Sequence, residues 1–135
     1  LHRLSVSKVT VDGARPARFT HRSGRLDIRL QQPAAVGDEL TLAITYGGHP
    51  TPVGGPLGDA GWEELADGVI VAAQPHGAPS WFPCNDRPDD KATYVVELTA
   101  PTAYYVLCNG VLVEQRRGAS TMTWRVCLGA GPVSA

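Results

Sequence analysis

Apolar and polar residues alternate with a period near two in several segments of the chain, which is the pattern of half-buried β-strands. The clearest alternating runs are residues 3–11, which contain one slip, 25–30 and 39–46. Residues 69–73 are a short apolar run typical of a strand, and strands are also expected at 93–99 and 121–127. No segment shows the apolar spacing of an amphipathic helix. We therefore expect an all-β fold of eight or nine short strands, arranged as an antiparallel β-sandwich or as a saddle-like domain of two sheets.

Turn dipeptides divide these runs into hairpins. Ser23-Gly24 separates residues 17–21 from 25–30, and Asn109-Gly110 separates 104–108 from 111–115. Both dipeptides tolerate the positive φ angles of a tight two-residue turn. The sequence predicts a hairpin at each of them, a polar turn at residues 116–119, and the end of the run 93–99 at Pro101.

Residues 47–61 lack a strand pattern. They carry six glycines and three prolines and few apolar side chains. We expect a long irregular excursion there, followed by one helical turn from Trp62 to Leu65.

Residues 74–94 combine turn formers, aromatic side chains and ionisable groups more densely than any other segment. Pro75, Pro79, Pro83 and Pro88 each fix φ and remove a backbone donor. The segment is therefore predicted to be a shaped loop rather than a helix or a central strand. Ordered loops of this length in compact domains often carry function, so a site is sought here first.

Composition narrows the class of protein. The 135 residues, 43% hydrophobic and 19% charged, fit one soluble β-domain spanning residues 1–135. A net charge of −1 gives no electrostatic reason to expect nucleic acid or an anionic membrane as a partner. The chain contains neither an apolar run long enough for a bilayer nor a signal-peptide core. Three cysteines cannot all pair within it, so we expect free thiols and a reducing, cytoplasmic location.

The loop offers two kinds of candidate chemistry. His76, Cys84, Asp86 and Asp90 include metal-ligand types, but their spacing matches no zinc pattern, and aspartates in such loops commonly cap turns. We expect no metal site here, and a self-contained turn in which a buried carboxylate meets backbone amides or Lys91.

The aromatic side chains have two interpretations. Trp62, Trp81 and Phe82 would form a platform for a peptide or glycan if they are exposed together, as in a stand-alone β-sandwich binding module. They would instead be apolar anchors if the loop packs over a sheet, because tryptophan and phenylalanine bury large areas. The sequence favours anchors and leaves the binding module as the alternative.

The loop also resembles the N-terminal β-domain of the aminopeptidase N family of zinc metallopeptidases, which includes leukotriene hydrolases. The residues that carry this resemblance are Gln74, Trp81, Phe82, Pro83, Cys84, Asn85, Asp86, Pro88, Asp90, Lys91, Ala92 and Tyr94. Shorter matches in family order occur at residues 9–13, 37–40, 44–48 and 109–110.

The resemblance implies a domain without its own catalytic centre. In that family zinc is held by a separate catalytic domain with an H-E-x-x-H helix, and His2, His21, His49 and His76 never occur in that arrangement. We therefore expect no cofactor in this chain, zinc in the catalytic domain of the same polypeptide, and a chain that is a truncated N-terminal domain. The expected partners are that catalytic domain and the N-terminus of a peptide substrate.

The resemblance assigns one substrate contact to this chain. Aligned without gaps on Pro83, Cys84 and Asp86, Gln74 occupies the position at which the family binds the free α-amino group of the substrate. A side-chain carbonyl oxygen accepts hydrogen bonds from an ammonium group, so the chemistry is consistent. Pro75 and His76 complete the expected substrate-binding segment, and the resemblance predicts a cis bond between Gln74 and Pro75.

Overall fold

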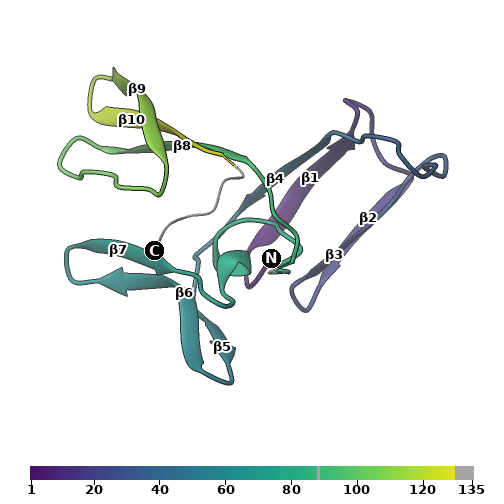
Figure 1. The fold of residues 1–135 in the computed structure, drawn as a ribbon, viewed down its shortest axis with the longest axis horizontal. Coiled ribbons are helices and arrows are strands. Elements are labelled where there is room, and N and C mark those ends of the chain that lie inside the picture. Colours follow the sequence, from purple (N-terminus) through teal and green to yellow (C-terminus); the bar gives the residue numbers. More distant parts are fainter. Residues whose placement is uncertain (88, 130–135) are drawn as a thin grey trace. The chain divides into compact units, whose positions relative to one another are not determined.

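The structure, a computed structural model, describes residues 1–87 and 89–129. Within them the chain forms ten β-strands and one short 3-10 helix, and every strand pairing is antiparallel (Figure 1). The elements are β1 (Ser5–Val11), β2 (Arg18–Arg22), β3 (Arg25–Arg29), β4 (Leu42–Gly47), β5 (Val53–Gly55), β6 (Gly58–Leu65), β7 (Gly68–Ala72), the helix (Ala78–Ser80), β8 (Tyr94–Pro101), β9 (Val111–Arg117) and β10 (Thr121–Leu128). The predicted all-β class is confirmed.

The chain divides into two compact units, and each is described by itself. The first is Leu1–Asp86 and the second begins at Arg87, so the boundary falls inside the predicted loop. Pro88 and the last six residues lie outside the described part of the chain. No helix in residues 1–87 or 89–129 has the length and apolar character needed to cross a membrane.

In the first unit β1 pairs with β4, and the slip in the alternation of β1 has a structural counterpart. The register shifts between Val6 and Lys8, where one extra residue bulges out of the ladder. The bulge restores the inward direction for Val9, which is 3% exposed and packs in the core of this unit with Leu1 and Leu4.

The hairpin predicted around Ser23-Gly24 is confirmed as β2 and β3. Both turn residues have positive φ, 50° and 79°, and Arg22 pairs with Arg25 across the turn. Leu26 and Ile28 are half-buried on one face of β3, with the charged residues between them exposed.

The irregular excursion predicted for residues 47–61 is wrong, and so is the helical turn from Trp62 to Leu65. Both segments contribute to a three-stranded sheet in the order β5-β6-β7, in which Trp62 pairs with Val71 and Leu65 with Gly68. Pairing with a neighbouring strand satisfies the backbone polar groups of these residues, which outweighs their local helix propensity.

The second unit is a three-stranded sheet in the order β8-β10-β9. The strand predicted for residues 104–108 is absent from the described structure, and the predicted hairpin at Asn109-Gly110 is therefore wrong. β10 lies between β8 and β9, so residues 102–110 carry the chain from one edge of the sheet to the other. Among residues 87 and 89–129, which are the described part of this unit, the buried apolar side chains are Trp124 and Val126 of β10, at 3% and 5% exposure.

β9 also runs further than predicted, because Arg116 belongs to the strand and not to a turn. Its guanidinium forms ion pairs with Glu97 across the sheet, at 3.0 Å, and with Glu114 in the same strand, at 3.2 Å. The turn follows at residues 118–120, where the Gly118 N–H donates a hydrogen bond to the Thr121 carbonyl.

Candidate functional site

The loop that begins at residue 74 leaves the sheet directly after β7. Gln74 lies two residues beyond Ala72, the last residue of β7, and both Gln74 and Pro75 are exposed. The bond between them is cis, as predicted. The Gln74 side chain thus stands at the end of a paired strand with its amide open to solvent.

His76 turns back toward the sheet. Its ring lies so close to Gly55 of β5 that a Cβ added there would lie 2.5 Å from the His76 Cε1 atom. The His76 Nε2 atom is buried and has no hydrogen-bond partner in the described structure. Of the three expected substrate-binding residues, His76 is therefore the one held against the domain.

The 3-10 helix that follows is tied to β6 by a serine. Ser80 is fully buried, and its Oγ accepts a hydrogen bond from the Trp62 N–H at 2.9 Å. Gly77 enters the helix with φ of 110°, a value that favours glycine, and its carbonyl accepts the Ser80 N–H. The His2 N–H donates to the Pro79 carbonyl at 2.6 Å and holds the same turn from the N-terminal segment.

The aromatic residues of this unit are arranged as anchors. Trp81 and Phe82 pack edge to face with ring centroids 4.9 Å apart, and both are half-buried. Trp62 is also half-buried, with its indole nitrogen enclosed by the protein. This geometry favours the anchoring interpretation over an open aromatic platform.

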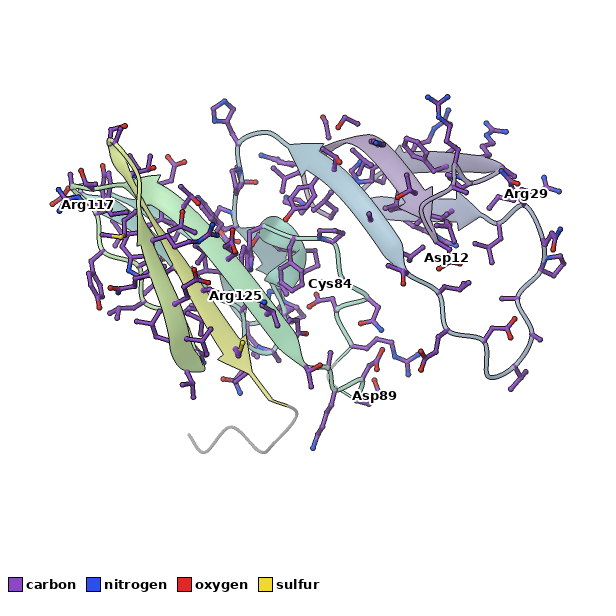
Figure 2. The ribbon with its side chains drawn as sticks, turned by 90° about the horizontal axis from the view of Figure 1, so that it is seen from above. Asp12, Arg29, Cys84, Asp89, Arg117 and Arg125 are labelled. Atoms are coloured by element: carbon purple, nitrogen blue, oxygen red, sulfur yellow. The ribbon has the colours of Figure 1, made fainter. Side chains whose placement is uncertain are left out.

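Cys84 follows on the irregular stretch after the helix (Figure 2). Partial burial raises the pKa of its thiol, and a backbone hydrogen bond with Asp86 offsets part of that rise. The three cysteines of the chain are free thiols. Among the described residues, no group of three or more histidine, cysteine, aspartate or glutamate side chains is placed to hold a metal ion.

The expectation of a buried carboxylate in the second half of the loop is wrong. Asp86, Asp89, Asp90 and Lys91 are all exposed. Arg87 pairs with Asp89, with 2.7 Å between the guanidinium Nη2 and a carboxylate oxygen, and this partner lowers the pKa of Asp89. A turn in water can pair its carboxylates with neighbouring cations at little desolvation cost, so no burial is needed.

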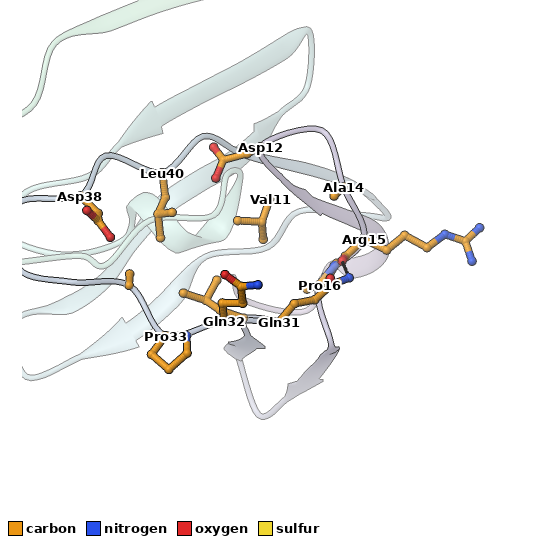
Figure 3. A pocket seen from close by; sticks show the side chains of 12 residues that line it. Val11, Asp12, Ala14, Arg15, Pro16, Gln31, Gln32, Pro33, Asp38 and Leu40 are labelled. Atoms are coloured by element: carbon orange, nitrogen blue, oxygen red, sulfur yellow. Dashed lines mark hydrogen bonds between the residues drawn. The ribbon is translucent and has the colours of Figure 1, made fainter.

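A pocket of about 340 Å³ lies elsewhere in the first unit, between the end of β1 and the segment that joins β3 to β4 (Figure 3). Asp12, Gln32, Pro33 and Leu40 are among its lining residues. The Asp12 N–H donates a hydrogen bond to the Thr41 carbonyl, and an Asp12 carboxylate oxygen accepts one from the Thr41 N–H, at 2.8 Å each. The pocket is thus lined in part by turn-stabilising groups and contains none of the expected substrate-binding residues Gln74, Pro75 and His76.

Sequence reasoning missed Ser80, Gly61 and Gly77, the residues that fix the loop to β6. A small residue opposite a glycine gives no periodic signal, and a buried serine is indistinguishable in sequence from an exposed one. The sequence around Gly61 also does not predict its positive φ of 100° within β6.

Comparison with known proteins identifies the family. The family model described as peptidase M1 N-terminal domain matches residues 4–126. The comparison with curated proteins gives no match.

Solved structures agree with the family model. A two-domain M1 zinc metallopeptidase mutant bound to L-arginine is 28% identical with a TM-score of 0.88, and the match covers 94% of this chain and 29% of that one. The M1 zinc metallopeptidase from Deinococcus radiodurans is 27% identical with a TM-score of 0.86, at the same coverage. This chain thus spans less than a third of the length of these relatives. With a family model that matches most of its residues, the chain belongs to the N-terminal domains of the M1 peptidases.

Proposed function

We propose that this chain is the N-terminal domain of a zinc-dependent aminopeptidase, in which Gln74 binds the free α-amino group of a peptide substrate. The observation that carries the proposal is the position of Gln74, an exposed side chain at the end of β7 between two anchored segments of backbone. The catalytic zinc would belong to the catalytic domain of the same polypeptide, as the length of the M1 relatives supports.

The chemistry of the amide suits this role. The Gln74 carbonyl oxygen accepts a hydrogen bond from a substrate ammonium group, and hydrogen bonds to charged groups contribute about 1.5–3 kcal/mol. A peptide whose amino group is acylated lacks that charged donor, so the contact selects free N-termini. In solved relatives the bound molecules are L-arginine, L-tryptophan and a Tyr-Ser-Ala substrate, and each has a free α-amino group in its ordinary form.

Pro75 and His76 support this contact without making it. Pro75 has a fixed φ directly after Gln74, and His76, the residue after it, is held by the packing of its ring on Gly55. Both restrict the directions open to the Gln74 side chain, which lowers the entropy lost when substrate binds.

The test uses the full-length protein with a peptide that has a free N-terminus. Gln74→Ala should lower kcat/KM by about ten- to a hundredfold, the equivalent of one charge-assisted hydrogen bond. Gln74→Glu adds a negative charge opposite the ammonium group and should lower KM. Gln32→Ala, at an exposed glutamine remote from the loop in sequence, is the matched control and should leave kcat/KM unchanged.

Circular dichroism of each variant reports whether the fold is intact. An unchanged kcat/KM in Gln74→Ala, with the peptide still cleaved by the wild-type protein, would refute the amine-binding role. Absence of peptide cleavage and of bound zinc in the full-length wild-type protein would refute the aminopeptidase itself.

A further inference from the structure

The short segment that carries Gln74 starts and ends at the same residue of β6. Ala72, the last residue of β7, pairs with Gly61 in the β6-β7 ladder. After four intervening residues the chain returns to Gly61 at Gly77, and a Cβ added to Gly77 would lie 2.6 Å from the Gly61 nitrogen. We call residues 73–76, which include Gln74, the bridge.

The return contact requires glycine on both sides. A Cβ added to Gly61 would lie 2.5 Å from the Gly77 carbonyl oxygen and 2.8 Å from the Ser80 Cβ, much closer than van der Waals contact. Both glycines also have positive φ, 100° and 110°, which disfavours any side chain at either position.

Ser80 completes the closure. β5 pairs only with residues 58–60 of β6, so beyond Ala60 that edge of β6 has no strand partner among the described residues. Ser80 supplies the missing acceptor, because its buried Oγ receives the Trp62 N–H. An edge strand whose N–H is satisfied by a buried side chain holds that side chain in one place.

We infer that Gly61 and Ser80 position Gln74 for substrate by closing the bridge against β6. With both ends of the bridge fixed on one residue, its backbone has little freedom, and the Gln74 amide is presented from a defined point. The inference rests on the proposed role of Gln74 and adds to it that Gly61 and Ser80 act on the substrate only through Gln74.

The alternative is that Gly61 and Ser80 only stabilise the domain. The two differ in how substitutions combine. If Gly61 acts through Gln74, replacing Gly61 lowers kcat/KM only in an enzyme that still has Gln74. If Gly61 is only structural, its effect on kcat/KM is the same with or without Gln74, because independent sites add.

The experiment is a double-mutant cycle in the full-length enzyme, with Gly61→Ala and Gln74→Ala alone and combined. Gly58→Ala is the matched control, since Gly58 lies in the same strand with φ of 104° but has no atom within 4 Å of an added Cβ. Gly61→Ala should lower kcat/KM about ten- to a hundredfold more than Gly58→Ala, because displacement of a binding group by about 1 Å costs that much. In the Gln74→Ala enzyme, the further loss from Gly61→Ala should be less than about twofold.

Two outcomes would overturn the inference while leaving the role of Gln74 intact: an equal loss from Gly61→Ala in both backgrounds, or a loss no larger than that of Gly58→Ala. A Gln74→Ala enzyme with unchanged kcat/KM would instead remove the proposed function, and the inference with it. If Gly61→Ala gives no folded protein, the same cycle is run with Ser80→Ala, which removes one oxygen atom and adds no bulk; a loss that persists undiminished without Gln74 would again overturn the inference.

Discussion

Replacing Ser80 by alanine tests the anchoring of the loop without reference to activity. Ser80 is fully buried, and its Oγ is the acceptor for the Trp62 N–H at 2.9 Å. In Ser80→Ala the side-chain volume changes little, but the Trp62 N–H loses an acceptor that is itself fully buried. A buried donor left without a partner costs about 1–3 kcal/mol.

That cost has a local readout. If the Trp62 amide exchanges with solvent when the loop opens, destabilising the closed state by this amount speeds exchange about 5- to 140-fold. Hydrogen exchange followed by mass spectrometry in the full-length protein, on a peptide that contains Trp62, measures the change. The matched control is Ser7→Ala, because the Ser7 Oγ donates to the Thr45 carbonyl at 3.2 Å on an exposed surface where water can replace it.

The outcome separates two descriptions of the loop. Faster exchange at Trp62 in Ser80→Ala, with the rate at Trp62 unchanged in Ser7→Ala, agrees with a loop held by the serine. Exchange at Trp62 that stays within about twofold of wild type would refute the reasoning, because the hydrogen bond would then contribute nothing to closure.

Two further predictions concern the ionisable groups of the loop. Because burial raises the pKa of Cys84, its thiolate population at pH 7 is reduced, and iodoacetamide should modify Cys84 more slowly than the exposed Cys108; equal rates by peptide mass spectrometry would contradict this. Because Arg87 lowers the pKa of Asp89, the stabilisation from this pair is present above the pKa of Asp89 in the unfolded chain and is lost as pH falls through the lower pKa in the folded chain. Arg87→Ala should therefore raise the pKa of Asp89 in a titration followed by nuclear magnetic resonance, with little change in thermal stability because both side chains are well exposed.

Alternating strands were predictable from sequence because one of their faces is buried. In β1 even the slip in the alternation corresponds to the register shift between Val6 and Lys8. The hairpin at Ser23-Gly24 was predictable for a second reason, since its turn residues adopt the positive φ that the dipeptide favours.

The errors have a common physical cause. Residues 104–108 are apolar like a strand, and Asn109-Gly110 has the chemistry of a tight turn, as a hairpin requires. The strand that pairs with both β8 and β9 is nevertheless β10. Which strands become neighbours depends on the whole sheet and not on the segment. The same applies to Trp62 in β6, whose local helix preference yields to pairing with Val71 of β7.

At the candidate site, the resemblance singled out Gln74, whereas the close packing of Gly61 against Gly77 and Ser80 was found only in the structure. The turn between β6 and β7 separates Gly61 from Gly77 in the sequence, and no pattern around either glycine predicts that the two come into contact. Their contact follows from a close approach of two backbones, which requires the absence of side chains and so leaves no apolar pattern.

The glycine-rich segment before the loop therefore has a different meaning from the one its composition first suggested. The ring of His76 packs against Gly55, and the backbone of Gly77 and the side chain of Ser80 pack against Gly61. These glycines lie in paired strands, so their role is to present a smooth surface on which a proline-stiffened loop can pack closely. The loop and the glycine-rich strands therefore pack as one unit, because the strands leave space that the loop fills. The Gln74 side chain remains exposed, as its proposed contact with a substrate requires.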